Sequence, residues 1–493
     1  MTSVLHHLFQ LTRRRLSSAA ISRIASVLLL VSVVQPHAYA SPWLEADDAD
    51  LRQSLLTLAN AGLITVPVNT YPLPWRAIMA DVEQLKVQQL SPHLQFAVSH
   101  LRHYLYQAQY GAQTSIMLSG HSEELPLADF GSAFYERGNI AVQRNFIGTN
   151  WAARVQVNQR FEPFAEDQDT TFDGSYLAAK LGDWVISIDA LPLWWGPGQD
   201  SALVMSTNAR PLEKLQLSQF RAKPFAWTGT EWLGPLSFTT FVARLDPDRQ
   251  DVEDSYLWGA RLTSRPLPAL ELGLSHALQF GGDKLDPLTN MSSSVNRNNL
   301  LGIDARYSFS NYYGTGAVYA ELASDTAASL ADSAWLVGVE WHQGDANVMQ
   351  SWFIELTDTL AACQSDATRA GNCLYEHVDY VQGYRHFEQS IGSQYDTDTK
   401  AVTLGFRWYD SAANGWQGKL RYILFNRDNS QPNRGGHPYF AQATERQQID
   451  FGRIQGLLGG LLKVNLQAWR DQPRGQAWQD LEWGGSISWE WRF

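Results

Sequence analysis

Residues 151–162 read WAARVQVNQRFE, with apolar side chains at nearly every second position. Successive side chains of an extended strand point to opposite faces, so this alternation predicts a strand with one apolar and one polar face. LELGLSHALQF at residues 270–280 repeats the pattern, which continues along most of the chain beyond residue 111. The sequence therefore predicts a large all-β region.

About eighteen segments fit this pattern, most of them about ten residues long, as a tilted strand needs to cross a bilayer. An even number of such strands predicts a transmembrane outer-membrane β-barrel with antiparallel strands. Segment 213–227 is the weakest, so the count is open by two. The expected strands are 112–119, 134–145, 151–162, 175–182, 184–193, 213–227, 236–246, 255–264, 269–280, 300–309, 314–322, 334–343, 348–357, 401–410, 416–426, 445–455, 461–470 and 481–493.

The connections between these segments alternate in length. Tight turns such as IGTN, RPLP, NYYG, GDAN and AANG alternate with the long polar stretches 163–174, 194–212, 281–299, 358–400 and 427–444. Outer-membrane barrels have short periplasmic turns and long external loops. If the first strand starts in the periplasm, the long loops lie outside and both ends of the mature chain lie inside.

The N-terminal segment has the composition of a secretory signal peptide. Three basic residues at 13–15 precede an apolar run from Ile24 to Val34, and Ala38-Tyr39-Ala40 ends the segment with a small-x-small pattern. We expect a signal peptide over residues 1–40. The alternative is a short membrane anchor, but the run is well below the ~20 residues that span a bilayer.

The charge balance excludes one class of partner. Of 38 Lys and Arg, four lie in residues 1–40 and no acidic residue does, which leaves 34 basic against 50 acidic residues and a formal charge of −16. Nucleic-acid affinity comes largely from neutralised phosphates, so we expect no nucleic-acid partner. The chain also has no basic run that would bind anionic lipid headgroups.

The two cysteines, Cys363 and Cys373, lie in the polar stretch CQSDATRAGNC. In an oxidising compartment this spacing favours a disulfide that closes the loop, with two free thiols as the alternative. Neither CxxC nor paired His accompanies them, so we expect no zinc or other metal site and no cofactor.

Residues 41–111 have a helical period. Asp47 and Asp48 can cap a first helix that ends near Gly62, a second begins at Pro74, and a third follows Ser91-Pro92. We expect a small helical bundle on the periplasmic side, with the barrel over 112–493. The bundle could plug or cap the barrel mouth, or hang free in the periplasm.

The chain ends in SISWEWRF, residues 486–493. Alternation places Trp489, Trp491 and Phe493 on one face, which we expect to contact outer-membrane lipid. Phe493 resembles the terminal aromatic residue that the barrel assembly machinery recognises.

Residues 182–212, GDWVISIDALPLWWGPGQDSALVMSTNARPL, resemble the signature region of the Wzi family of capsule assembly proteins. Residues 47–75, DDADLRQSLLTLANAGLITVPVNTYPLPW, and residues 382–408, QGYRHFEQSIGSQYDTDTKAVTLGFRW, are similar to further segments of that family. The resemblance runs from about residue 43 to the C terminus. It implies an outer-membrane barrel of a Gram-negative bacterium with an N-terminal helical bundle, which holds exported capsular polysaccharide on the outer leaflet and is not an enzyme.

The loop that follows the tryptophan pair is the candidate polysaccharide-binding site. Indole faces suit the apolar faces of sugars, and amide, carboxylate and guanidinium groups suit their hydroxyls. The candidate residues are Trp194, Trp195, Gln199, Asp200, Asn208 and Arg210. Alternatively, the two tryptophans belong to an interfacial aromatic girdle.

Five arginines lie at positions expected to face the lumen: Arg154, Arg160, Arg244, Arg261 and Arg306. They either pair with Glu162, Glu271 or Glu340 to fill the interior or offer cationic contacts to an acidic polysaccharide.

External loops such as DPDRQDVED at 246–254 are acidic, which opposes an acidic ligand. One hypothesis is that divalent cations bridge loop and ligand carboxylates, in which case a chelator weakens retention. YDTDT at 395–399 supports this only weakly.

The chain lacks GxSxG, HExxH and phosphate-loop motifs. We therefore expect a monomeric binding protein, with a porin-like channel for sugars or other small solutes as the alternative.

Overall fold

The computed structural model describes residues 43–110, 114–122, 127–131, 135–164, 168–224, 231–247, 249, 251–282, 297–324, 333–361, 374–377, 379–429 and 437–493. The expected signal peptide and both cysteines, Cys363 and Cys373, lie outside these residues. Within them, no helix is long and apolar enough to cross a membrane.

The helical region begins the described chain. Its elements are β1 (Trp43–Leu44), α3 (Ala49–Asn60), β2 (Thr70–Tyr71), β3 (Leu73–Pro74), α4 (Trp75–Gln84), the 3₁₀ turn η1 (Val87–Gln89) and α5 (Pro92–Tyr110). The three α-helices occur where the sequence predicts them. Asp48 caps α3, because its carboxylate accepts the Leu51 N–H at 2.9 Å. The apolar faces of the helices pack into one buried cluster.

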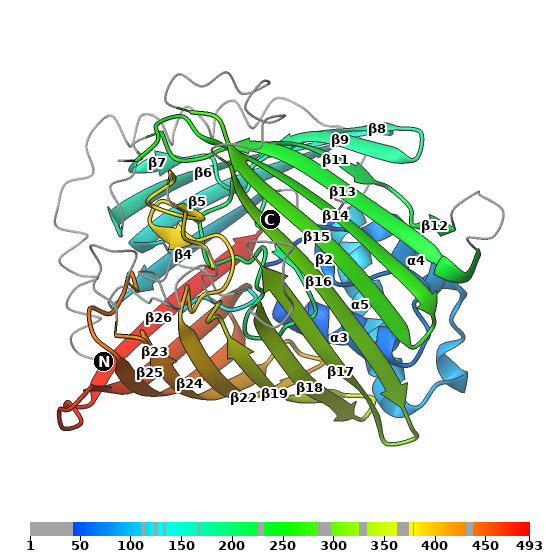
Figure 1. The fold of residues 1–493 in the computed structure, drawn as a ribbon. Coiled ribbons are helices and arrows are strands. Elements are labelled where there is room, and N and C mark those ends of the chain that lie inside the picture. The colour runs from blue at the N-terminus through cyan, green and yellow to red at the C-terminus, as the bar shows by residue number, and fades with distance from the viewer. Residues whose placement is uncertain are drawn as a thin grey trace.

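The later strands form a closed antiparallel barrel (Figure 1). They are β4 (Thr114–His121), β5 (Glu136–Ile147), β6 (Trp151–Pro163), β7 (Thr170–Thr171), β8 (Tyr176–Leu181), β9 (Trp184–Asp189), β11 (Lys214–Gln219), β12 (Lys223–Pro224), β13 (Pro235–Arg244), β14 (Tyr256–Leu267), β15 (Leu270–Phe280), β16 (Asn298–Ser310), β17 (Gly314–Ser324), β18 (Ala334–Gly344), β19 (Val348–Asp358), β22 (Thr399–Asp410), β23 (Gly415–Phe425), β24 (Thr444–Leu457), β25 (Gly460–Pro473) and β26 (Glu482–Arg492).

Two of these twenty strands, β7 and β12, are two-residue segments that pair with β6 and β13 beside the longer β8 and β11. In the part of the chain that the structure describes, eighteen spans therefore surround the lumen, as predicted. The expected strand 213–227 is interrupted, since β11 ends at Gln219 and only β12 follows. Outside the barrel sheet lie β10 (Trp194–Trp195), η2 (Glu231–Leu233), β20 (Arg385–His386) and β21 (Gln389–Ser390).

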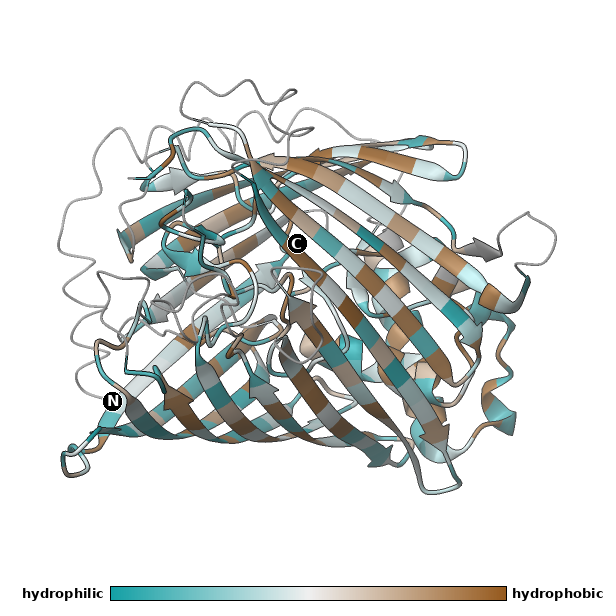
Figure 2. Cartoon of the chain, viewed as in Figure 1, coloured by the Kyte–Doolittle hydropathy of each residue, from teal (hydrophilic) through white to brown (hydrophobic). Residues whose placement is uncertain are grey.

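The outer surface of the barrel is apolar and its inner surface is polar. On β15, Leu272 and Leu274 are exposed to the outside at 37% and 51%, whereas Glu271 and Ser275 on either side of them are buried in the interior. Figure 2 shows the resulting alternation of brown and teal bands along the strands. A closed barrel with an apolar exterior satisfies its backbone groups internally and is stable in lipid.

The last strand closes the barrel against the first, because β26 pairs with β4. At the seam, Phe493 donates its N–H to the Thr114 carbonyl at 2.9 Å and accepts the Thr114 N–H at 3.2 Å. Trp491 and Phe493 are exposed on the outside at 41% and 50%. The faces of SISWEWRF are therefore as predicted.

The helical bundle lies in the barrel rather than hanging free of it. The blue helices of Figure 1 occupy one end of the barrel and reach into it. The Ser54 hydroxyl on α3 lies 2.5 Å from the Tyr409 hydroxyl on β22, and the Thr57 hydroxyl lies 3.0 Å from a ring nitrogen of His342 on β18. Of the two arrangements left open by the sequence, the plugged barrel is the one observed.

Candidate functional site

Trp194 and Trp195 lie inside the barrel, where β10 pairs with β2 of the helical region. Both side chains are 0% exposed. The Trp194 ring packs edge-on against Phe130, with centroids 5.3 Å apart, and Trp195 packs against Phe241 at 5.7 Å. Neither indole offers an open face to a sugar and neither faces lipid. Both expectations for the pair, a sugar platform and an interfacial girdle, are corrected: the loop folds inward, where burial stabilises large aromatic side chains.

At the two glycines of the Gly-Pro-Gly turn after the tryptophans, there is no room for a side chain. Gly196 has φ +138°, and a Cβ there would lie 2.7 Å from a carboxylate oxygen of Glu321. A Cβ on Gly198 would lie 1.9 Å from the Ser201 carbonyl oxygen. The Gly198 carbonyl in turn accepts a hydrogen bond from Arg52 of α3 at 2.8 Å. Glycine therefore lets this loop pack directly against the helix and the barrel wall. We call residues 43–110 and the inserted loop 190–213 the plug.

Glutamates of the barrel wall hold the inserted loop by its backbone. Glu355 on β19 accepts the N–H groups of Gln199 and Ser201 at 2.7 and 2.9 Å. Glu321 on β17 accepts the Leu203 N–H at 3.0 Å. A buried carboxylate is stable when several donors replace its water shell, and these backbone amides are such donors.

Glu271 on β15 does the same for the helical region, accepting the N–H groups of Val68 and Asn69 at 3.0 and 2.9 Å. The sequence suggested Glu271 only as a partner for an arginine, and Glu321 and Glu355 were missed. The only sequence signal for each of these residues is a glutamate at an inward-facing position of a strand. The backbone amides that the glutamate binds are distant in sequence, so no local pattern reveals the contact.

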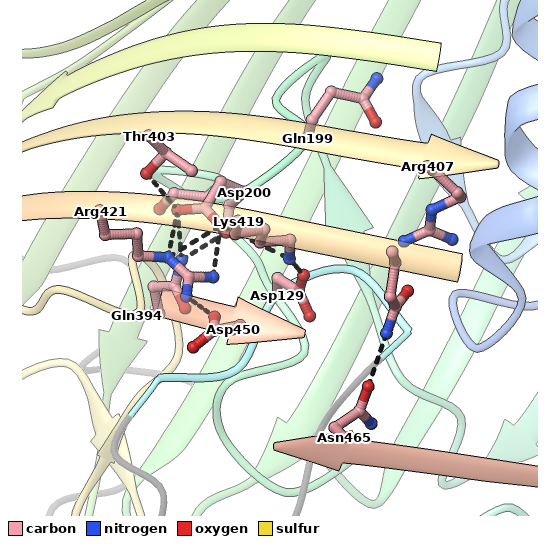
Figure 3. A network of polar contacts seen from close by, with 12 residues as sticks. Asp129, Gln199, Asp200, Gln394, Thr403, Arg407, Lys419, Arg421, Asp450 and Asn465 are labelled. Atoms are coloured by element: carbon pink, nitrogen blue, oxygen red, sulfur yellow. Dashed lines mark hydrogen bonds and ion pairs between the residues drawn. The ribbon is translucent and has the colours of Figure 1, made fainter. Parts of the chain in front are cut away.

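Asp200 forms the centre of the polar network in Figure 3. Its carboxylate accepts a hydrogen bond from Arg421 Nη2 at 2.7 Å, from the Thr403 hydroxyl at 2.9 Å and from the Gln394 amide at 3.0 Å. The Tyr395 hydroxyl donates to the same carboxylate. Asp200, which the sequence predicted as a ligand contact, thus forms its hydrogen bonds with protein groups instead.

Ion pairs extend this network across the lumen. Lys419 on β23 pairs with Asp129 and lies 3.6 Å from Asp200. Arg421 also pairs with Asp450 on β24. The network fastens the plug to the wall formed by β22, β23 and β24. Removing one member would leave a buried charge without its partner, which is strongly destabilising.

Two other predicted ligand contacts also bind protein groups. Asn208 donates its amide to the Ser390 carbonyl at 3.0 Å. Arg210 forms a two-point pair with Asp173, at 3.0 and 3.1 Å, and its guanidinium lies 4.5 Å from the Phe387 ring centroid.

Four of the five predicted lumen arginines point inward and are paired: Arg154 with Glu45 at 2.8 Å, Arg160 with Glu136 at 2.7 Å, Arg261 with Asp304 at 2.7 Å, and Arg306 with Glu340. They fill the interior as ion pairs, the first of the two alternatives. Glu340 also accepts the Gln199 amide at 2.5 Å. Of the other suggested partners, Glu162 and Glu271 lie instead 3.8 Å from Arg137 and 4.0 Å from Arg265.

Arg244 does not face the lumen, so that prediction is wrong. Its side chain is 54% exposed and pairs with Asp254. On β13 the neighbouring side chains of Phe241 and Ala243 are buried, whereas Val242 between them is 39% exposed. Arg244 shares the outward face with Val242, because residues two apart on a strand lie on one face.

Residues 374–377 and 379–399 cover the inserted loop. The Tyr375 and Tyr384 hydroxyls donate to the carbonyls of Leu203 and Val204 at 2.5 and 3.1 Å. In Figure 1 this yellow segment lies at the end of the barrel away from the blue helices. Nearby, burial lowers the pKa of His437 to about 4, so the ring is neutral at pH 7.

The acidic groups suggested as cation ligands are engaged by bases. Asp396 of YDTDT pairs with Arg385 at 2.6 Å and Asp398 lies 3.4 Å from Arg427. In the acidic loop 246–254, Asp251 pairs with Arg249 at 2.9 Å. The cation-bridging hypothesis gains no support from these carboxylates.

A cavity of about 510 Å³ lies between the plug and the wall that includes β4, β5, β6, β25 and β26. We call it the polar trough. Amide side chains that line it include Asn139, Gln143, Asn145, Gln156, Asn158 and Asn465. Tyr135, near its outer end, donates to the carbonyls of Thr207 and Ala209 at 2.7 and 3.0 Å, and burial raises the pKa of this hydroxyl, which keeps it a donor.

Comparison with known proteins finds similarity in sequence and in fold. Residues 107–471 match the family described as capsule assembly protein Wzi. An "uncharacterized 55.8 kDa protein in cps region" of Klebsiella pneumoniae is 25% identical over 358 residues, which cover 69% of each chain.

Among solved structures, Wzi of Escherichia coli is described as an outer membrane protein involved in group 1 capsule assembly and a carbohydrate-binding β-barrel. It aligns with a TM-score of 0.78 at 21% identity, over 92% of this chain and 99% of that one. OprD of Pseudomonas aeruginosa aligns with a TM-score of 0.45 at 8% identity, over 78% and 95% of the two chains.

The family match spans most of the described barrel, and the plugged barrel agrees with the fold of the solved relative. This protein is an outer-membrane β-barrel, and the chain belongs to the capsule assembly protein Wzi family.

Proposed function

We propose that this protein binds exported capsular or extracellular polysaccharide at the cell surface and helps to attach it there. Membership of a capsule assembly family and the fold shared with a carbohydrate-binding barrel support the proposal. The protein acts by binding, as a monomer in outer-membrane lipid, and breaks no bond of its ligand.

The filled lumen is the observation that carries this proposal. Glu321 and Glu355 bind backbone amides of the inserted loop, and the buried Asp200–Arg421 pair fastens it to β23, two strands beyond β19 in the barrel. Such a barrel keeps its plug in place, so a polymer at the cell surface meets the outer loops and not an open channel. A diffusion channel, in contrast, needs an open lumen.

A porin-like channel for small solutes is the second candidate, and the polar trough is the observation that favours it. The trough occupies about 510 Å³ along one wall. Planar-bilayer conductance separates the two functions, because a plugged binding protein conducts little, whereas a diffusion channel conducts steadily.

Loss of the protein should release polysaccharide into the medium while synthesis continues. Cell-bound and released polysaccharide are measured in a deletion strain, with re-expression of the wild-type chain as the control. Polysaccharide that stays on the deleted cells contradicts the proposal, and so does a purified protein that shows steady conductance and no affinity for the polymer.

A further inference from the structure

We propose that the polar trough is itself a saccharide site, which takes an uncharged, hydroxyl-rich oligosaccharide stretch inside the barrel. This inference rests on the proposed function and assigns to it a site distinct from the external loops. The trough runs beside the plug, along the wall of β4 to β6, β25 and β26, away from the wall glutamates Glu271, Glu321 and Glu355.

The trough extends along most of a strand. Glu136 and Ile147, the two end residues of β5, both line it. They are eleven residues apart, which corresponds to about 36 Å of strand at ~3.3 Å per residue. The cavity volume of about 510 Å³ lies within the roughly 300–1,000 Å³ of small-molecule sites. An elongated polar space of this size suits a short extended polymer segment better than a compact ligand.

The amides that line the trough match hydroxyl groups. Gln143 on β5 and Gln156 on β6 are paired in register and both line the trough. The Gln143 side chain forms no hydrogen bond with a described residue, and Gln156 uses its amide for Asn158 at 3.0 Å. An amide donates and accepts, as a sugar hydroxyl does, so these groups can exchange water for hydroxyls without losing hydrogen bonds.

The charged groups of the trough are largely neutralised by one another. Arg154 pairs with Glu45, Arg160 with Glu136, Arg407 with Asp50 and Arg492 with Glu490, at 2.7 to 3.2 Å. Asp47 and Lys463 also line the trough, and burial raises the pKa of Asp47 to about 7. A ligand with its own charge would have to break these pairs, whereas an uncharged segment leaves them intact. The trough therefore selects neutral sugar units.

The sharpest test fills the trough without removing a polar group. Ala141 on β5 lines it, and Ala141→Trp would occupy it. Ala153 on β6 is in register with Phe146 on the outward face, so Ala153→Trp is the matched control that adds the same bulk toward lipid. The probe is extracellular polysaccharide from the cells that express the protein, together with short fragments from partial hydrolysis, separated by charge and size.

A second pair of variants keeps the volume nearly constant. The double change Gln143→Leu and Gln156→Leu removes the amides, and Gln159→Leu on β6 is the control on the other face of the strand. We expect uncharged fragments to bind the full-length protein in detergent. The double variant should bind them about tenfold or more weakly, the loss expected for two missing hydrogen bonds. Ala141→Trp should weaken binding by at least as much, because the indole occupies the space of the ligand. Calorimetry measures binding, and near-unchanged circular dichroism shows that each variant is folded.

Equal fragment affinity in the trough variants and their controls overturns the trough assignment, and so does a wild-type protein that binds the intact polymer but no uncharged fragment. In both cases the proposed function stands. A wild-type protein that binds neither polymer nor fragments overturns the proposed function as well. Conductance that falls in Ala141→Trp without a change in fragment binding overturns the site in favour of solute passage.

Discussion

Asp200 shows how one side chain fixes a whole loop in this barrel. It is 0% exposed, and Arg421, Thr403 and Tyr395 all donate to its carboxylate. These partners come from segments about 200 residues away. A carboxylate buried in this way is stable only while its donors remain, so its contribution depends on the entire network.

Substitution Asp200→Asn should lower the free energy of unfolding by about 3–5 kcal/mol, because it leaves Arg421 buried with one charge partner fewer. Denaturant unfolding in detergent micelles measures the change. Asp254→Asn is the matched control: it breaks an arginine–aspartate pair whose side chains are 54% and 57% exposed, and exposed pairs contribute only about 0–1 kcal/mol. Equal losses in the two variants would show that the Asp200 network does not stabilise the barrel.

The inserted loop acts as one element with the helices. It pairs with β2 through β10, contacts Arg52 of α3 through the Gly198 carbonyl, and meets the wall at Glu321 and Glu355. The loop is therefore packed against β2, α3 and the barrel wall, and Gly196 and Gly198 lie where this packing leaves no room for a side chain. The inserted loop is therefore held both by its backbone amides and by buried side chains such as Asp200.

Gly198→Ala should displace the inserted loop and open the lumen to ions, because the added Cβ would lie 1.9 Å from the Ser201 carbonyl oxygen. Planar-bilayer recordings should show conductance above that of the wild type. Gly456→Ala on β24 is the control, since a Cβ there has no atom within 4 Å. Conductance that stays at the wild-type level in Gly198→Ala would mean that the loop absorbs the methyl group without moving.

Most of the plug contacts described above lie on one side of the barrel, and Arg154 of β6 binds the plug residue Glu45 from the other side. The glutamates that bind the plug lie on β15, β17 and β19, and the Asp200 network lies on β22 to β24. The opposite wall keeps its inward amides for the polar trough. Barrel closure through β26 and β4 holds both walls together.

Deletion of Phe493 should impair insertion into the outer membrane more than polysaccharide binding by the protein that does insert. The residue completes the β26–β4 seam with Thr114 and presents its ring to the outside. Membrane fractionation measures insertion, and Phe493→Trp, which keeps a terminal aromatic ring, is the control. Normal insertion of the deleted chain contradicts a role for Phe493 in recognition by the assembly machinery.

The sequence by itself determined the local parts of this protein. Two-residue alternation identified eighteen spans, the cap at Asp48 and Pro92 marked helix starts, and SISWEWRF indicated a lipid-facing strand. These features follow from periodicity and neighbouring residues, which are written along the chain. The helical bundle was predicted for the same reason, although its position was not.

Only the tertiary structure decided what lies in the lumen. Trp194 and Trp195 have the same neighbours in sequence whether they face a sugar, lipid or the plug, and Arg244 at the end of β13 lies on the outward face, where it pairs with Asp254. The carboxylates that bind distant backbone amides leave no local pattern. The polar trough likewise depends on how the plug packs inside the barrel, through contacts between segments that are far apart in the sequence.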